Sequence, residues 1–284
     1  HYIAGGCATA FKRKDFLMEV GLHEIDGLHD QDFKRPIMEL LGLFKGVEFL
    51  KIPELYHIRK GDFSYVLSEG KQAKEQLKRD FPKEEKNINE FFITIEKLYK
   101  EMHQMPRSKW FRRLIHPLMP LLYPAIASTS RITAGEWLDK HFKDERLKTI
   151  LTANMCYYTD DPFNLSLMYF LVAQGSYLNG GGHFVKGGSQ NLSNYLVHFI
   201  EQHGGQVLMG KYAKEILIEN NRAVGVAYQD TFNRTIPMVK VYADTVIANA
   251  AQPNVAQMLP EPQCRVLQKR IGKLRPACSL LSVY

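Results

Sequence analysis

The sequence has few cysteines and lacks the short motifs that mark most catalytic and metal sites. Its 284 residues contain four widely spaced cysteines with no CxxC pair: Cys7, Cys156, Cys264 and Cys278. None of the ten histidines belongs to an HExxH motif or pairs with another histidine four residues away. A GxSxG turn and a P-loop are also absent. We therefore expect reduced, mostly buried thiols, no metal site, and chemistry that depends on a cofactor rather than on a side-chain nucleophile.

Long apolar runs are missing as well, which excludes a helix that crosses a membrane. The apolar stretch Leu114–Ala127 is interrupted by three prolines, whereas a spanning helix needs about 20 unbroken apolar residues. In front of it, residues 107–113 mix arginine and lysine with Trp110 and Phe111, a combination that suits lipid headgroups. Two interpretations follow. Residues 107–127 contact a membrane surface peripherally, or they form a proline-broken helical hairpin packed inside the protein.

The composition is that of a globular protein with a moderate excess of positive charge. At 45% hydrophobic residues the chain can build a core, and its net charge of +7 permits an anionic partner without naming one. It contains no nucleic-acid recognition module, so we expect no nucleic-acid partner. No signal peptide is present, which favours a cytoplasmic location, with peripheral membrane contact if residues 107–127 provide it. The chain opens on what reads as the end of a loop, which suggests a piece of a longer protein.

The hydrophobic pattern divides the chain into a mixed part (1–68), a helical part (69–175) and a second mixed part (176–284). Residues 4–21 read as a turn and a short strand, typical of an ordinary hairpin. The predicted helices are Arg35–Phe44, Glu69–Arg79, Glu84–Glu101, Arg146–Tyr158 and Leu165–Ala173, the last capped by Asp161 or Asn164. The predicted strands are Glu48–Ile52, Leu55–Ile58 and Tyr65–Leu67. Thr133 and Glu136 have the spacing of a capping box.

A glycine-rich stretch, Tyr177–Ser189, leads into the last third of the chain. It holds five glycines in thirteen residues, so it either turns tightly or lets a ligand lie against the main chain. Ser189 is a candidate N-cap for a helix that ends at Gly204-Gly205. Beyond it the pattern predicts strands at Gln206–Met209, Ile216–Glu219 and Ala223–Tyr228, with a turn at Asn220-Asn221, and a buried strand over Val241–Ala250.

A set of small-residue motifs follows one another in a familiar order along essentially the whole chain. These are Gly5-Gly6-Cys7, Gly21-Leu22-His23, Lys186-Gly187-Gly188-Ser189, Ala213-Lys214-Glu215-Ile216, Arg222-Ala223-Val224-Gly225-Val226, Ala243–Ala250 and Leu274-Arg275-Pro276. Each motif is loose, but together their order and spacing resemble the phytoene desaturase and carotenoid isomerase group of FAD-dependent oxidoreductases, with the retinol saturase branch closest. The resemblance implies a mixed α/β and α+β fold, in which a split, Rossmann-like FAD-binding domain is interleaved with a mixed-sheet and helical substrate domain.

The resemblance also implies a domain organisation that is incomplete at both ends. Residues 1–42 and 186–250 would belong to the FAD-binding domain, and residues 43–185 and 251–284 to the substrate domain. The strand–GxGxxG–helix unit that holds the FAD pyrophosphate is absent and would lie before His1, and the segment that closes over the flavin would lie after Tyr284. Val185 stands where relatives usually carry proline before the Lys-Gly-Gly motif.

The eight cofactor-binding residues that the resemblance implies are Gly5, Gly6, Gly21, Leu22, His23, Ala213, Asn249 and Ala250. Small residues suit most of these places, because a flat cofactor that lies along the backbone leaves no room for a bulky side chain. His23 is the one side chain that would lie near the flavin ring, as a candidate catalytic residue. A structural histidine is the alternative.

The function implied by the resemblance is redox chemistry on C=C or CH–CH bonds of a hydrophobic polyene such as a carotenoid or retinoid. Hydride would pass between FAD and a substrate carbon, with NAD(P) as an electron partner to consider. Saturation, desaturation and isomerisation are not separated by the sequence. Two alternatives stay open, a non-catalytic lipid-binding or membrane-surface protein that keeps the fold, and an amine oxidase with a polar substrate.

Overall fold

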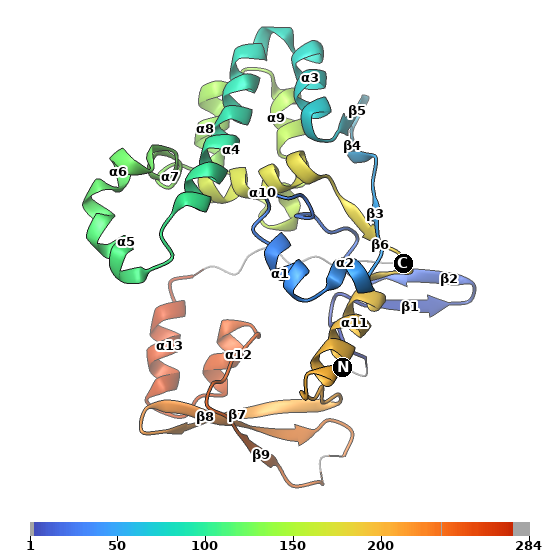
Figure 1. The fold of residues 1–284 in the computed structure, drawn as a ribbon, viewed down its shortest axis with the longest axis vertical. Helices are drawn as coiled ribbons and strands as arrows, with labels where there is room; N and C mark the ends of the chain where they lie inside the picture. The colour runs from blue at the N-terminus through green and yellow to red at the C-terminus, as the bar shows by residue number, and fades with distance from the viewer. Residues whose placement is uncertain (1–2, 234, 275–284) are drawn as a thin grey trace. The chain divides into compact units, whose positions relative to one another are not determined.

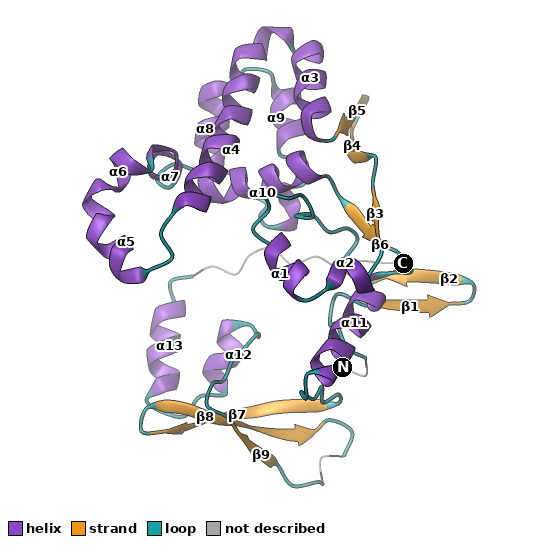
Figure 2. Ribbon diagram, in the orientation of Figure 1, coloured by secondary structure: helices purple, strands orange, loops and turns teal. Residues whose placement is uncertain are grey.

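The computed structural model describes residues 3–233 and 235–274, which form two units (Figure 1). Unit 2 comprises residues 10–192, and unit 1 combines residues 3–9 with residues 193–274. Both contain helices and antiparallel strands (Figure 2), which confirms the predicted mixed fold. The four predicted domain segments, with boundaries after residues 42, 185 and 250, remain a prediction. Arg275 and Pro276 of the predicted late motif lie outside the described residues.

The core of unit 2 is built around α4 (Glu85–Gln104). Apolar residues recur every three or four positions along this helix, and they are buried: Ile88, Phe91, Phe92, Ile95, Leu98 and Tyr99. They belong to one core with residues of α3 (Gly70–Asp80), α8 (Ala134–His141), α9 (Glu145–Leu151) and α10 (Leu167–Gly180). α10 can approach α4 closely because Gly175 has no side chain. A Cβ at this position would overlap Ile95 and Tyr99. α3 and α4 confirm the helices predicted over Glu69–Arg79 and Glu84–Glu101.

Three antiparallel strand pairs complete unit 2. β1 (Ala10–Arg13) and β2 (Phe16–Glu19) form the predicted N-terminal hairpin, and β4 (Glu54–Lys60) and β5 (Phe63–Ser68) form the second. β3 (Phe49–Lys51) pairs instead with the distant β6 (His183–Val185). An isolated bridge between Ile25 and His183 adds the segment around residue 25 to this ladder. The ladder therefore joins three parts of the chain that are far apart in sequence.

The proline-rich part of unit 2 folds as a series of short helices. They are α5 (Lys109–Ile115), α6 (Met119–Leu122) and α7 (Pro124–Thr129), with a 3₁₀ turn over His116–Leu118. Each proline lies in the first turn of its element, where the missing N–H breaks no helical hydrogen bond. Ile115 and the start of α7 are buried, whereas much of α5 and α6 is exposed. Within the described residues, no helix is long and apolar enough to cross a membrane.

Unit 1 is a three-stranded antiparallel meander with helices. β7 (Lys211–Glu219), β8 (Arg222–Asp230) and β9 (Val239–Tyr242) follow in sequence order, and α12 (Gln252–Gln257) and α13 (Gln263–Ile271) come after them. α11 (Ser189–Gln202) begins in unit 2 and continues into unit 1. Asn220 and Asn221 both have positive φ, so the predicted turn between β7 and β8 is confirmed.

Two of the strands predicted in unit 1 are wrong. In both cases all or most of the predicted segment lacks, among the described residues, a neighbouring strand to form hydrogen bonds with. Residues 206–209 are irregular. The buried strand predicted over Val241–Ala250 is replaced by β9, which is exposed and ends at Tyr242. The segment beyond it is irregular and open, with Ile247 89% exposed. In the described part of the chain no second segment pairs along these residues, and an apolar run becomes a buried strand only when neighbours cover it.

Other boundaries also differ from the predictions. The helix predicted over Arg35–Phe44 is two helices, α1 (Arg35–Leu40) and α2 (Leu43–Gly46), because Gly42 takes a left-handed φ of 67°. The helix predicted over Arg146–Tyr158 consists of α9 and a 3₁₀ turn, Met155–Tyr157. α10 begins after Ser166, not after Asp161 or Asn164, and runs to Gly180. The glycine-rich stretch is therefore a helix end, the strand β6 and a tight turn, not one long loop.

Glutamates remote in sequence satisfy the backbone at two helix starts in unit 2. Glu101 of α4 accepts the amides of Ala125 and Ile126 in α7, at 3.0 and 2.9 Å. Glu84 is buried and accepts the amides of Lys143 and Asp144 at the entry to α9, at 2.7 and 3.1 Å. Because the first amides of a helix have no partner within it, these carboxylates anchor α7 and α9 to the α4 layer. The predicted Thr133–Glu136 capping box starts α8 in the same way, but locally.

The hydrogen bonds to Glu84 predict a pH-dependent stability. Burial by itself would raise the pKa of this carboxyl, but the hydrogen bonds from Asn87, Lys143 and Asp144 outweigh burial and hold its pKa below the ordinary value. The stabilisation is therefore fully present above the unfolded-state pKa and is lost as the pH falls through the lower, folded-state pKa. Glu84→Gln should lower the free energy of unfolding by about 1–3 kcal/mol at neutral pH, and by much less in acid.

Urea unfolding of both proteins over a pH series measures this difference. Glu85→Gln is the matched control, because Glu85 is exposed and should change the free energy by less than about 0.5 kcal/mol. A Glu84→Gln deficit that persists unchanged into acid would contradict the assignment.

Candidate functional site

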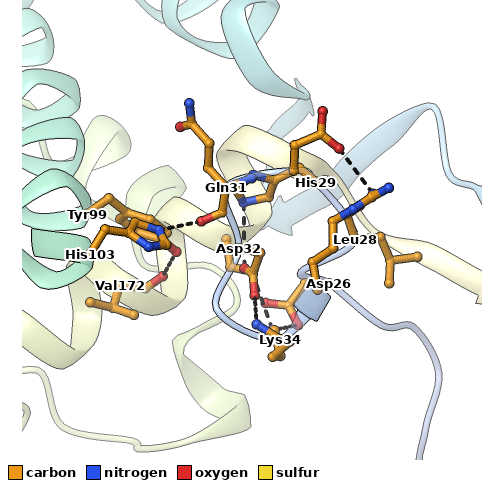
Figure 3. Close-up of polar contacts among 12 residues, drawn as sticks. Asp26, Leu28, His29, Gln31, Asp32, Lys34, Tyr99, His103 and Val172 are labelled. Carbon is orange, nitrogen blue, oxygen red and sulfur yellow. Dashed lines mark hydrogen bonds and ion pairs between the residues drawn. The ribbon is translucent and has the colours of Figure 1, made fainter. Parts of the chain in front are cut away.

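The loop of residues 26–35 is held in place by a buried carboxylate, that of Asp32. Only 2% of Asp32 is exposed. Its Oδ1 accepts the backbone amide of Lys34 at 2.8 Å, and its Oδ2 accepts the hydroxyl of Ser176 in α10 at 2.6 Å. His29 lies 3.6 Å from the same Oδ2, as Figure 3 shows beside the other polar contacts of the loop. Asp32 therefore stabilises the turn within the loop and also attaches the loop to α10.

A lysine continues this network across the loop. The ammonium of Lys34 donates to Asp26 at 2.6 Å (Figure 3). It also reaches the Ser176 hydroxyl at 3.4 Å. Arg35 donates to the carbonyl of Leu28 at 2.5 Å. The charges of the loop are thus paired inside it, which fixes its shape and leaves little free charge to bind a ligand.

The outer side of the loop lies against α4. His103 donates to the carbonyl of Gln31 at 2.8 Å, and Tyr99 donates to the carbonyl of Val172 in α10 at the same distance (Figure 3). A polar groove of about 730 Å³ opens here, lined by Asp30, Gln31, Glu96, Tyr99, Lys100, His103, Gln104 and Asn179. Burial lowers the pKa of His29, which favours its neutral imidazole. The loop, α4 and α10 are thus joined by polar contacts (Figure 3).

Glu24 and Tyr177 form a second polar pair beside the glycine-rich stretch. Glu24 hydrogen-bonds with Tyr177, and a Cβ on Gly182 would collide with its carboxylate. Burial raises the pKa of Glu24; the hydrogen bond with Tyr177 opposes this rise, and the nearby Asp26 adds to it. The absence of a side chain at Gly182 is therefore what admits the Glu24 carboxylate to this place.

The second half of the glycine-rich stretch is occupied by the chain itself. Glu19 of β2 accepts the backbone amide of Ser189 at 2.7 Å and its hydroxyl at 2.5 Å, at the start of α11. Gly188 has a φ of +92°, and a Cβ there would meet Glu19, Ala10 and Leu17. A carboxylate thus fills the position where a phosphate would bind at a helix start. These contacts support the interpretation of Gly187-Gly188 as a packing turn, and Ser189 is the first helical residue rather than a cap.

The eight predicted cofactor-binding residues are divided between the two units. Gly5, Gly6, Ala213, Asn249 and Ala250 belong to unit 1, and Gly21, Leu22 and His23 belong to unit 2. No hydrogen bond or ion pair joins any two of the eight side chains within the described residues. His23, Asn249 and Ala250 are exposed. Their roles toward a cofactor stay predictions.

The two neighbouring glycines near the N-terminus differ in what surrounds them. A Cβ on Gly5 would collide with Ala8 and with Ser193, whose hydroxyl donates to the Ala8 carbonyl at 2.6 Å. Gly6 has a φ of +59° and no atom within 4 Å of the place a Cβ would take. Gly5 is therefore required by internal packing. Gly6 alone of the pair presents open backbone, which fits the close approach of a flat cofactor.

Sequence reasoning missed the residues that organise this region, namely Asp32, Ser176, Lys34 and Glu19. Each is an ordinary polar residue whose role depends on a contact that its local pattern does not report: Asp32 with Ser176, Lys34 with Asp26, and Glu19 with Ser189. Only the glycines at 182 and 188 gave a signal, because a glycine marks a place where something approaches the backbone. The sequence does not reveal that the approaching groups are the chain's own carboxylates.

A family model described as "Flavin containing amine oxidoreductase" matches residues 4–280. An "Inactive all-trans-retinol 13,14-reductase" from Danio rerio is 25% identical over 99% of this chain and 48% of its own length. A "Phytoene desaturase (neurosporene-forming)" from Cereibacter sphaeroides is 29% identical over 63% of this chain and 35% of its own length. The chain thus spans about half the length, or less, of these curated relatives. They match the group whose resemblance the motifs indicated.

A solved structure supports the fold. The PF1083 protein from Pyrococcus furiosus superposes with a TM-score of 0.60 at 18% identity, over 96% of this chain and 57% of that protein. At this identity the likeness concerns the fold alone.

The Asp32 network predicts how the 26–35 loop responds to a change of one atom. Asp32→Asn removes the charge and one acceptor from a buried site, so the free energy of unfolding should fall by about 1–3 kcal/mol. Amide hydrogen exchange in residues 26–35 should accelerate at the same time. Asp30→Asn is the matched control, because Asp30 lies two residues away but is exposed, and its ion pair among the described residues is with Arg35 at 3.3 Å. Equal effects of the two substitutions would contradict the central role of Asp32.

Proposed function

Because the chain belongs to the family of flavin-containing amine oxidoreductases, we propose that it is part of an FAD-dependent oxidoreductase that acts on a hydrophobic polyene. The observation that carries this proposal is the family match over residues 4–280, together with relatives named for reactions of retinol and phytoene. The reaction would reduce or form a C=C bond by hydride transfer, with the flavin supplying the redox chemistry when bound.

The side chains of this chain would mainly position the reactants. A polyene such as phytoene offers no charge to bind, so binding depends on shape and on exclusion of water. The rigid 26–35 loop and the Glu24–Tyr177 pair supply fixed polar groups in unit 2. In unit 1, Gly6 and the exposed backbone at Asn249 and Ala250 would accommodate the cofactor. The expected NAD(P) electron partner finds no support in the comparisons and is not part of the proposal.

A second candidate is a protein that keeps the fold and binds lipid without turnover. It is favoured by the relative whose name calls it inactive, because that relative is similar to this chain over 99% of this chain and 48% of its own length. The two candidates differ in redox activity and not in fold.

Anaerobic mixing of the flavin-reduced, full-length protein with a conjugated polyene separates these candidates. An enzyme that saturates should reoxidise its flavin while the polyene absorption moves to shorter wavelength, because conjugation is lost. An enzyme that desaturates should, in the converse experiment, reduce its oxidised flavin while the absorption of a hydrogenated polyene moves to longer wavelength. A protein that carries flavin but leaves every polyene and hydrogenated polyene unchanged would be the non-catalytic candidate. A full-length protein purified without the yellow flavin spectrum would overturn the proposal itself.

The open backbone at Gly6 predicts a selective effect on flavin binding. Gly6→Ala should weaken flavin binding by about tenfold, because the added methyl group projects into the space proposed for the cofactor. Gly61→Ala is a closely matched control: Gly61 lies in the β4–β5 turn with a φ of +57° and equally open surroundings. Both substitutions should cost about 1–2 kcal/mol of stability through left-handed strain. Flavin titration of the apoprotein that finds equal affinities for the two variants would refute the role of Gly6.

A further inference from the structure

α5, the 3₁₀ turn after it and α6 expose several large apolar side chains to solvent. Trp110, Leu114, Leu118 and Leu121 are 72%, 59%, 53% and 79% exposed. Trp110 and Leu114 are four residues apart in α5 and so share one side of that helix, whereas Leu118 lies in the 3₁₀ turn and Leu121 in α6; Ile115 is buried. We name these four residues the α5–α6 stripe. Four large apolar side chains exposed within twelve residues of one segment indicate an interaction surface.

The base of this segment is anchored, so the stripe is presented by a fixed part of unit 2. Tyr123 donates to the carbonyl of Gln104 at the end of α4, at 3.5 Å, and Glu101 holds the first amides of α7. Between these points α5 and α6 project as an arc from α4 to α7 (Figure 1). The projection is therefore a feature of the fold and not a loose end.

The charges around the stripe have one sign only. Residues 102–135 contain no aspartate or glutamate, but they contain Arg107, Lys109, Arg112 and Arg113 close to the stripe. Within the described residues none of these four cations makes an ion pair. Arg112 and Arg113 line an open groove of about 590 Å³ together with His116, Pro117 and Met119. Unpaired cations beside an exposed tryptophan and leucines complement a surface that combines phosphate groups with hydrocarbon.

We propose that the α5–α6 stripe and its four cations dock unit 2 on an anionic lipid bilayer. The stripe would enter the boundary between headgroups and acyl chains, and the cations would lie at the level of the lipid phosphates. A protein partner would need an apolar surface that fits the stripe and carboxylates placed opposite the four cations. An anionic bilayer supplies hydrocarbon and negative phosphate groups without any such specific fit. This inference does not depend on the redox chemistry, because binding to vesicles is measured without turnover.

Co-sedimentation of the full-length protein with phosphatidylcholine vesicles, with and without phosphatidylserine, tests the proposal. The wild type should bind the vesicles that contain phosphatidylserine, and binding should weaken with salt. A triple variant, Lys109→Gln, Arg112→Gln and Arg113→Gln, should bind on the order of 100-fold more weakly, at about fivefold for each cation removed. Trp110→Ala with Leu121→Ala should weaken binding at every salt concentration.

A second groove on the same unit gives a matched control. Lys83, Lys86 and Lys97 line it, but Glu85 and Glu90 lie among them. The triple variant Lys83→Gln, Lys86→Gln and Lys97→Gln removes the same charge and should bind as the wild type does. Unchanged unfolding temperatures exclude misfolding as the cause of any loss. Trp110 fluorescence should also shift to shorter wavelength on binding, and a Trp110→Phe variant should lose this shift while Trp137, which is buried, stays silent.

Three results would overturn the proposal. The wild type could ignore anionic vesicles even at low salt, or both triple variants could lose binding equally, which would indicate a general charge effect. Slow hydrogen exchange across α5 and α6 in a full-length protein that does not bind vesicles would show that another protein segment covers the stripe.

Discussion

Carboxylates that accept backbone amides from distant segments are the interactions on which unit 2 most depends. Glu101 holds the start of α7, Glu84 the entry to α9, and Glu19 the start of α11. The first amides of a helix have no partner inside it, so a carboxylate beside them is favoured by the helix dipole. Glu101 accepts two amides of α7 and Glu84 the two amides just before α9, whereas Glu19 accepts one amide and the hydroxyl of the same serine. Each such contact adds a directional constraint to the apolar packing of its helix. Together with the core around α4, these contacts position α7 and α9.

Local patterns in the sequence predicted the elements whose partners are close by. The apolar face of α4, both hairpins of unit 2 and the Thr133 capping box depend on spacings of two to four residues. Predictions failed where a distant neighbour decides the outcome. Val241–Ala250 has the composition of a buried strand, yet only the part that pairs with β8 is a strand. A break such as that at Gly42 depends on a backbone angle that the pattern of apolar residues does not report.

The same limit applies to the candidate site. Gly5 and Gly6 are adjacent and indistinguishable in sequence, but one is enclosed by Ser193 and the other is open. The glycine-rich stretch suggested a ligand against the backbone, and the group found at Gly188 is the side chain of Glu19. A glycine in a sequence can indicate that another group lies too close to the backbone for a side chain. It does not indicate which group this is. Polar residues such as Asp32 acquire their role only from burial, which the sequence of a polar loop does not indicate.

The long sequence separation of these contacts affects how the chain is made on the ribosome. The partner of Asp32, the Ser176 hydroxyl, is synthesised 144 residues later. The partner of Glu19, the Ser189 amide, is synthesised 170 residues later. At synthesis rates of about 5–20 residues per second, the N-terminal hairpin and the 26–35 loop are out of the ribosome for on the order of 10 s before their partners exist. Throughout this interval β3 also lacks β6, so its edge is free to pair with another chain. Nascent-chain crowding or the lack of a chaperone should therefore damage this protein through residues 10–51, which contain β1, β2, the 26–35 loop and β3.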